Sequence, residues 1–335
     1  MLKQYIQTNI RVIMAAIVAI LLLAGFHSSA ANAQSANTLR VSPVRTDIQI
    51  EAGEQKIVEV TVTNVTDQPL SVRPIQNDFI AGDESGTPAL ILDETEFAPS
   101  HSLKRFLEPL QTAVIPAGES KTFEVVIIVP ADAQAGGYFG AVRFAPSSVA
   151  DGGQVNLSAS VASLILLTVP GDIVEKLDLT DFTIQQNGVN GDVFRGSDDL
   201  QVAVRFQNTG NVQIGPFGKV SVLKGNDLIY EADFNNKTPR DVILPDGARA
   251  WDIPLEDLGD FGYYSVTATF TYGENNQTIE ITKTFWIIPW SLVIGVLGGI
   301  LLLAAIGVAV WFFLKNYKRR ILRSNRQNPG SGRRG

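Results

Sequence analysis

Apolar and polar residues alternate along most of the segment between Gln34 and Lys283. In KIVEVTVTN, Val58, Val60 and Val62 fall on one face, and in KTFEVVIIVP the apolar residues again take every second position. A period of two is typical of β-strands that bury one face. Runs that alternate or are wholly apolar predict further strands, namely YFGAVRF, SASVASLILLTV, LQVAVRFQN, KVSVL, YYSVTATFTY and TIEITKTFWI.

Turn-forming residues separate these runs, as in VTDQP, DGGQ, NTGN, KGND and YGENN. No long amphipathic helical pattern competes with them, although HSLKRFLE is expected to form one or two helical turns. Many short strands joined by short turns predict an all-β ectodomain. We expect two tandem Ig-like β-sandwiches, over residues 34–172 and 173–285, followed by one C-terminal transmembrane helix.

A short stretch of the first sandwich occurs twice, as AGEQKIVEV from Ala52 and as AGESKTFEV from Ala117. Gly53 and Gly118 hold the same position, and glycine accepts the positive φ that a tight turn requires. We therefore predict two structural turns that each lead into a strand, with a shared ligand site as the alternative. The sequence LPDGARAWDIPL is a weaker third version in the second sandwich.

Two asparagines stand at equivalent places in the two halves of the ectodomain. Asn64 ends the predicted strand VEVTVTN, and Asn208 ends VAVRFQN. An Asn side chain at the start of a turn can bond to the backbone two residues on. Both residues are therefore predicted to shape turns.

The beginning of the chain has the pattern of a secretory signal peptide. Lys3 and Arg11 precede an apolar run that is too short to span a membrane well, and small residues follow. Ala31 and Ala33 take the small-residue positions before the expected cleavage site, so residues 1–33 are predicted to be removed. An uncleaved N-terminal anchor is the alternative.

The other end of the chain is predicted to cross the cell membrane. Ser291–Leu314 contains no charge, and as a helix it would be roughly 36 Å long, enough for a ~30 Å hydrocarbon core. Aromatic residues flank the transmembrane segment, 286–314, and a basic tail, 315–335, follows. The positive-inside rule then places the ectodomain outside and the tail in the cytoplasm. Gly295 and Gly299 form a G-x-x-x-G pattern, a candidate contact for a weak homodimer.

The composition argues against most catalytic chemistry. The chain has no cysteine and two histidines, of which only His101 follows the signal peptide. A serine–histidine triad would depend on that residue alone, and no nucleophile-elbow motif surrounds it. We predict no enzyme, metal site or cofactor. The acidic ectodomain also disfavours nucleic acid, whose phosphates need a basic face.

Two stretches remain as candidate binding sites. Tyr138 and Phe139 stand among glycines in AGGYFGAVRF and could stack on sugar rings, or could begin a core strand after a bend. The acidic stretches DESG and LDETE could hold calcium, but they lack the spacing of an EF-hand loop and also fit a solvated loop. Calcium binding stays open at this point.

The stretches SPVRTDIQIEAGEQKIVEVTVTNVTDQPL and IPAGESKTFEVVIIVPADAQAGGYFGAVRF resemble the extracellular domain of WxL-interacting proteins of Gram-positive bacteria. The second half, with LPDGARAWDIPL and FWIIPW, resembles less closely the domain that follows it there. The layout of signal peptide, two Ig-like domains, single membrane helix and basic tail is also similar. The resemblance implies binding to peptidoglycan and to WxL surface proteins, in complexes that act in adhesion, and it assigns no individual site residues.

These observations predict a membrane-anchored cell-surface protein that binds peptidoglycan, a partner surface protein, or both, in adhesion or the assembly of surface complexes. Two alternatives stay open. A carboxylate-dependent cell-wall hydrolase would need a cleft with two carboxylates about 5–10 Å apart. A membrane-tethered assembly factor would accept a strand from its client along an unpaired sheet edge.

Overall fold

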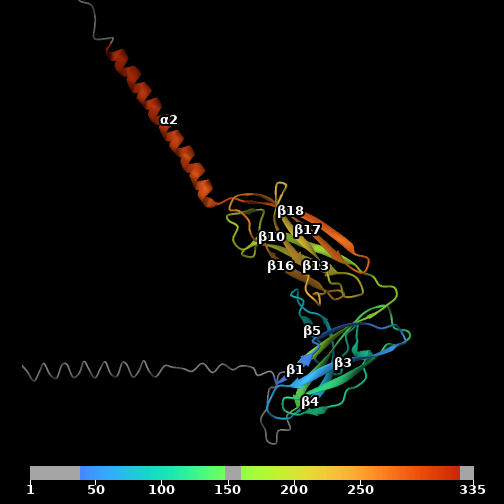
Figure 1. Ribbon diagram of the computed structural model, residues 1–335. Coiled ribbons are helices and arrows are strands. Elements are labelled where there is room, and N and C mark those ends of the chain that lie inside the picture. Colours follow the sequence, from blue (N-terminus) through green and yellow to red (C-terminus); the bar gives the residue numbers. More distant parts are fainter. Residues whose placement is uncertain (1–37, 148–159, 325–335) are drawn as a thin grey trace, which may run out of the picture.

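The computed structural model describes residues 38–147 and 160–324, which form two β-sandwiches and a long C-terminal helix (Figure 1). The predicted all-β fold with one terminal apolar helix is confirmed. The signal-peptide prediction, with Ala31 and Ala33, falls outside the described residues, as does the end of the predicted tail.

The first sandwich packs a sheet of three strands against a sheet of six. The smaller sheet has the order β1 (Leu39–Ser42), β3 (Gln55–Asn64), β7 (Ser120–Ile128). The larger sheet has the order β2 (Arg45–Gln49), β9 (Val161–Val169), β8 (Gly136–Ser147), β4 (Leu70–Ala81), β5 (Pro88–Leu90), and β6 (Ala113–Ile115) also pairs with β4. Between the sheets lies an apolar core that includes Val60, Phe123 and Phe144. The predicted helical turns reduce to one short 3-10 helix, η1 (Lys104–Phe106).

The second sandwich has the strand order of an Ig-like domain. One sheet runs β11 (Val189–Asn190), β10 (Leu177–Gln186), β13 (Leu200–Asn208), β16 (Ala248–Pro254). The facing sheet runs β12 (Val193–Phe194), β18 (Gln277–Ile287), β17 (Gly262–Tyr272), β14 (Phe217–Lys224), β15 (Asp227–Phe234). Its core is aromatic: the ring of Phe270 lies 5.0 Å from those of both Phe206 and Phe234. Edge-to-face contacts of this kind stabilise a core beyond the area that they bury.

The repeated stretch of the first sandwich forms two neighbouring strands, β3 and β7. They pair antiparallel with Glu59 opposite Glu124, and these two residues hold the same position in the two copies. The copies are thus related by an approximate twofold axis. Gly53, at φ 85°, and Gly118, at φ 70°, consequently turn the chain at opposite ends of the strand pair.

Each of these turns is bonded to the end of the other copy. The Gly53 amide donates to the Val129 carbonyl over 3.0 Å, and the Asn64 amide donates to the Glu119 carbonyl over 2.9 Å. The repeat therefore provides two matching ends for one strand pair.

Asn64 and Asn208 are fully buried and make matching hydrogen bonds in the two sandwiches. The Asn64 side-chain amide donates to the carbonyls four residues on (2.7 Å) and of Ile115 (3.0 Å). That of Asn208 donates, over 2.8 Å each, to the carbonyl four residues on and to that of Ile243. Each side-chain oxygen accepts the backbone amide two residues on. A buried amide that is satisfied in this way fixes the chain entering the next turn.

The last strand leads almost directly into the terminal helix, α2 (Trp290–Ser324). Among the described residues, α2 alone is long and apolar enough to cross a membrane, over the 29 residues Trp290–Lys318. Gly295 and Gly299 lie within this span. Strand β18 ends at Ile287, so two residues join the second sandwich to α2.

The Gly118 turn gives a direct test of backbone strain. The position has φ 70° and no atom within 4 Å of an added Cβ, so Gly118→Val should cost about 1 kcal/mol or more through strain alone. Thermal unfolding of the whole chain measures this loss. Gly196→Val is the matched control, because Gly196 has the same open surroundings outside the left-handed region. Equal losses in the two variants would contradict the turn prediction.

Candidate functional site

The two sandwiches share a small apolar cluster of their own. The outer face of β4, β8 and β9 is covered by the segment 242–244 of the second sandwich. The buried members of this cluster, here called the seam cluster, are Phe79, Phe139, Ala141, Leu166 and Leu244. The rings of Phe79 and Phe139 lie 5.9 Å apart. Strand β9 is therefore covered on both faces, which explains its largely apolar sequence.

A hairpin of the first sandwich, between β4 and β5, reaches onto the second sandwich (Figure 1). The carboxylate of Glu84 pairs with the guanidinium of Arg205 over 2.9 Å. The Glu84 carbonyl also accepts the Ala250 amide over 2.8 Å, at the edge of β16. Gly86 lies at φ 82°, a conformation that favours glycine, and an added Cβ there would meet the end of the Arg249 side chain of the second sandwich. The stretch DESG is thus part of the contact between the sandwiches.

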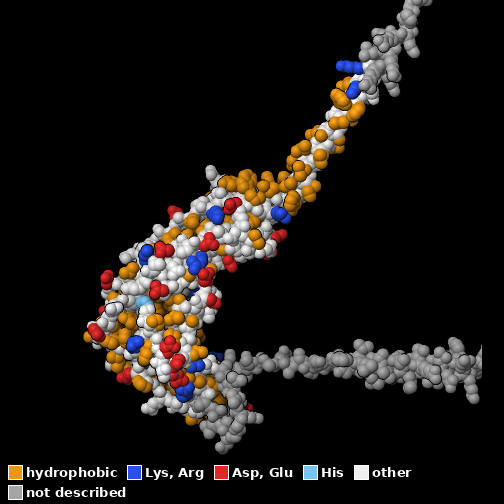
Figure 2. Space-filling view, turned by 180° about the vertical axis from the view of Figure 1, so that it is seen from behind, with side chains coloured by type: hydrophobic (Ala, Val, Ile, Leu, Met, Phe, Trp, Pro, Cys, Tyr) orange, Lys and Arg blue, Asp and Glu red, His pale blue; other side chains and the backbone are white. Residues whose placement is uncertain are grey.

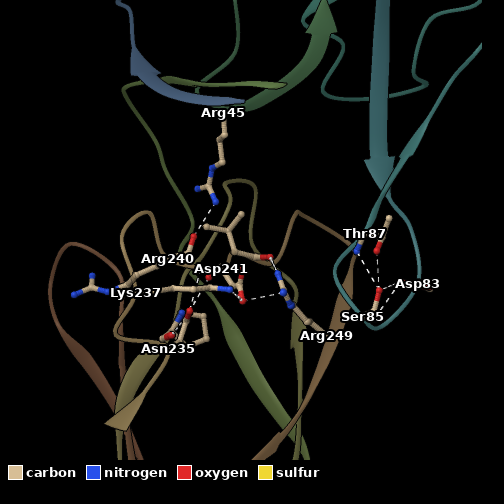
Figure 3. A network of polar contacts seen from close by, with 11 residues as sticks. Arg45, Asp83, Ser85, Thr87, Asn235, Lys237, Arg240, Asp241 and Arg249 are labelled. Carbon is tan, nitrogen blue, oxygen red and sulfur yellow. Dashed lines mark hydrogen bonds and ion pairs between the residues drawn. The ribbon is translucent and has the colours of Figure 1, made fainter. Parts of the chain in front are cut away.

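A polar network borders the seam cluster (Figure 3). Arg45 reaches from β2 and donates to the Arg240 carbonyl over 2.8 Å. Asp241 accepts both Lys237 at 2.6 Å and Arg249 at 2.9 Å. A cavity of about 150 Å³ remains between this network and the seam cluster. The charges near the seam are therefore paired, as partly buried charges must be to avoid a desolvation penalty.

Asn211, in the loop after β13, joins the second sandwich to the first. Its carbonyl accepts the Gly137 amide over 2.8 Å, and its side-chain amide donates to the Ala135 carbonyl over 3.2 Å. At Gly136 an added Cβ would lie 2.8 Å from the same Asn211 carbonyl. Gly136 and Gly137 therefore make room for a loop of the other sandwich.

Beside this joint lies a groove of about 660 Å³, called here the seam groove. Its walls are the loop before η1, the loop between β7 and β8, and Asn211. The side chains that give it its chemistry are His101, Arg105, Phe106, Asp132, Gln134 and Tyr138. The groove thus combines an apolar aromatic wall with a cation, a carboxylate, an amide and an imidazole.

Tyr138 forms part of the aromatic wall of the seam groove. Its ring lies 4.7 Å from that of Phe106, and its hydroxyl donates to the Gln134 carbonyl over 2.9 Å. Burial raises the pKa of the Tyr138 phenol, so the group stays neutral and able to donate near neutral pH. Its ring is half-buried and can still present a face to a ligand.

His101 lies in the left-handed region, at φ 58°, which is uncommon for a residue other than glycine. Its Nδ1 lies 2.6 Å from the Gly137 carbonyl; since a carbonyl only accepts, Nδ1 carries the proton. Its backbone carbonyl accepts the Phe139 amide over 2.8 Å. These bonds fix the imidazole at the edge of the seam groove.

A buried carboxylate, Asp78 on β4, supports the loop that carries His101. The side chain is fully buried and accepts the amides of Ala98 (2.9 Å) and Lys104 (2.8 Å) and the hydroxyl of Ser102 (2.6 Å). Three donors to one carboxylate offset the cost of burying its charge. Asp78 thus sets the shape of one wall of the groove.

The structure separates the two aromatic candidates of the sequence. Phe139 is only 2% exposed and belongs to the seam cluster, so its ring is not available to a ligand; Tyr138 remains. The glycine and asparagine turn residues lie at strand ends and do not line the groove.

The other acidic stretch, LDETE, makes its contacts within the first sandwich. Glu94 pairs with Arg73 over 2.9 Å, which lowers the pKa of Glu94, and Asp93 accepts the Thr95 amide over 2.8 Å. No group of three or more His, Asp or Glu side chains within 38–147 and 160–324 could hold a metal.

Sequence reasoning did not find Asp78, Arg205 or Asn211, and it considered Glu84 only as part of a calcium-binding or solvated loop. The available signals were weak: a carboxylate inside a strand, an acidic loop and an Asn in the motif NTGN. Their roles depend on partners that are remote in the sequence.

No family model and no curated protein matches the chain. Solved structures with low similarity include the class 5 fimbriae chaperone CfaA, at 13% identity and TM-score 0.36, covering 74% of this chain and 98% of that chain. The E. coli chaperone DraB is 14% identical, with TM-score 0.31, and the match covers 75% of this chain and 96% of that chain. A family 123 glycoside hydrolase from Clostridium perfringens is 13% identical over 40% of this chain and 24% of that chain, at TM-score 0.26. The fold assignment therefore rests on the strand order described above.

The seam cluster predicts that the sandwiches are held together by apolar burial. Leu244→Asp should separate them, because an unpaired carboxylate would replace a buried side chain. Faster hydrogen exchange of the Gly137 and Ala250 amides, which bond across the seam, would report the separation. Leu228→Asp, at a side chain 58% exposed, is the control and should leave both amides protected. Unchanged protection in Leu244→Asp would contradict this account of the seam.

The role of Asp78 predicts a second effect. Asp78→Ala leaves three donors without their acceptor and should cost about 3 kcal/mol of unfolding free energy. Asp132→Ala removes an exposed carboxylate of the same groove and should change stability by about 0.5 kcal/mol or less. Chemical denaturation of both variants measures the difference. Similar values for the two would show that Asp78 does not support the loop.

Proposed function

We propose that the protein is a membrane-anchored cell-surface binding protein, and that the seam groove is where it binds peptidoglycan or a surface protein. The observation that carries the proposal is the groove itself: about 660 Å³, with an aromatic wall and polar side chains at its rim. Binding sites are typically concave and largely apolar, with a few polar groups that orient the ligand.

The chemistry of the seam groove suits a glycan that carries peptides. The exposed face of Tyr138 can stack on a sugar ring, as aromatic side chains do with apolar ring faces. Arg105 can pair with a peptide carboxylate, while Asp132 and Gln134 can bond hydroxyl and amide groups. Peptidoglycan offers all of these groups, and an extended segment of a surface protein offers several of them.

In this proposal α2 is the membrane anchor. The two sandwiches keep the limits that the sequence predicts, 34–172 and 173–285. Basic residues lie at the far end of the apolar span, at Lys315 and Lys318, and the positive-inside rule then supports an orientation with the sandwiches outside and the tail inside the cell. Strand β17 runs from the end near α2 to the end near the first sandwich, and its 11 residues cover roughly 35 Å. The groove would thus stand well above the membrane, within reach of the cell wall.

The proposal predicts that Tyr138→Ala weakens binding about tenfold, since a stacked aromatic ring contributes about 1 kcal/mol or more. Cosedimentation of the ectodomain with purified peptidoglycan, and capture of surface proteins on the immobilised ectodomain, measure the effect. Tyr230→Ala on β15 is the control, because this half-buried tyrosine lies outside the groove.

Three outcomes would count against the proposal. Equal binding by the two tyrosine variants would remove the groove as the site. Retention of neither wall nor any surface protein by the unaltered ectodomain would refute the binding function. Release of soluble muropeptides would favour the hydrolase alternative.

A further inference from the structure

A row of large apolar side chains crosses three neighbouring strands at one end of the second sandwich. Val193 on β12 pairs with Trp286 on β18, which in turn pairs with Tyr263 on β17. The three are 61%, 42% and 46% exposed, and the rings of Tyr263 and Trp286 lie 4.8 Å apart. We call them the aromatic row. Its members share one outer face of the sheet.

Farther from α2, the outer face of β17 and β18 is polar. Two and four residues before Trp286, the same face of β18 carries Thr284 and Thr282. On β17 the corresponding positions are Ser265 and Thr267, and the hydroxyls of Thr267 and Thr282 lie 2.9 Å apart. On β17 and β18, the large apolar side chains of the outer face therefore lie at the end from which α2 leaves. Figure 2 shows hydrophobic side chains collected at this end of the second sandwich.

The connection to α2 keeps the aromatic row close to the helix. From Trp286 to Trp290 the chain can extend by roughly 14 Å at most. The connection is also bonded to β12: the Trp286 amide donates to the Asp192 carbonyl, and the Ile288 amide donates to the Phe194 carbonyl, both over 2.8 Å. A helix that crosses a membrane from Trp290 must therefore hold the row at the membrane boundary.

We propose that the aromatic row lies in the lipid headgroup layer and seats the second sandwich on the membrane. The inference rests on the proposed function in one respect, namely that α2 spans a bilayer. Trp and Tyr favour this layer because their rings are apolar at one end and polar at the other. Phe261, 49% exposed just before β17, extends the apolar surface.

A cation lies beside this surface. The guanidinium of Arg195 lies 4.6 Å from the centre of the Trp290 ring, next to the start of α2. Arginine at this depth can bond lipid phosphates while its ring contact keeps it at the boundary. The chemistry that the patch recognises is therefore a phospholipid surface, with apolar side chains entering it and a cation at its phosphates.

The absence of cysteine from the chain makes site-specific labelling simple. The full chain is reconstituted into vesicles of phosphatidylcholine and phosphatidylglycerol, with a fluorophore on a single introduced cysteine. Val193→Cys reports the aromatic row, and Thr282→Cys reports the same face farther from α2. Ile300→Cys, within the apolar span, reports membrane insertion. Lipids that carry a spin label near the headgroup, or iodide in the water, then quench the fluorophore.

The label at residue 193 should be quenched severalfold more by the headgroup spin label than the label at 282, and severalfold less by iodide. Trp286→Ser combined with Tyr263→Ser should abolish that difference, while thermal unfolding confirms that the second sandwich remains folded. If the double variant retains the difference in quenching between the labels at 193 and 282, the role of the aromatic row is overturned.

The remaining outcomes separate the inference from the function on which it rests. Lipid quenching at 300 with free iodide access at 193 would overturn the seating of the sandwich and leave the anchor intact. Absence of lipid quenching at 300 would overturn the anchor itself. Protection of 193 from iodide only after purified peptidoglycan is added would make the row a glycan surface, which also overturns the proposal.

Discussion

The outer face of β4, β8 and β9 is apolar, and the molecule must cover it. Leu164 and Leu166 on β9 point out of the first core, while the residues between and after them point into it. A sheet with two apolar faces needs a second layer, since a large exposed apolar patch would favour aggregation. The segment 242–244 of the second sandwich provides that layer. The relative position of the sandwiches, and with it the seam groove, follows from this constraint.

The fold meets a second constraint in the same way in both sandwiches. After β3 and after β13 the chain must enter a turn while its backbone groups are shielded from water. In each case a fully buried asparagine, Asn64 or Asn208, provides the missing donors and the acceptor. The partner in each case is the segment before a glycine-containing turn, which contains Gly118 in one sandwich and Gly247 in the other. The turns with the similar sequences AGES and PDGA thus each follow the segment that accepts the hydrogen bond of one buried asparagine.

The sequence predicted the strands whose alternation is undisturbed and missed those where function or packing interrupts it. The strands β3, β7, β13 and β17 alternate cleanly, and all were predicted. Strand β4 was not predicted, because Pro74 interrupts its apolar run. In addition, Asn77 and Asp78 are buried polar residues at positions where apolar residues are expected. Asp78 holds the loop that forms one wall of the groove, so the irregular strand is also one that supports the candidate site.

The candidate site itself was only partly accessible to prediction. The sequence indicated Tyr138 as a candidate because it follows two glycines. In the structure, however, these glycines leave space for the loop of the second sandwich that contains Asn211. Glu84 appeared as part of a solvated loop, since its partner Arg205 lies far along the chain. Periodicity reports which face of a strand is buried and gives no information on which remote loop buries it.

The contacts at each joint make the ectodomain a continuous support for the groove. Residues 170–176 connect the sandwiches, and a connection of this kind is often flexible. Here, however, the Val174 amide donates to the Asn211 side chain over 2.8 Å, and the Glu274 amide donates to the carboxylate of Glu175 over 2.9 Å. The linker is thereby bonded along the second sandwich, while Asn211 also bonds the first. The two sandwiches and the segment between them are thus joined by hydrogen bonds, and these contacts set the position of the groove relative to the second sandwich.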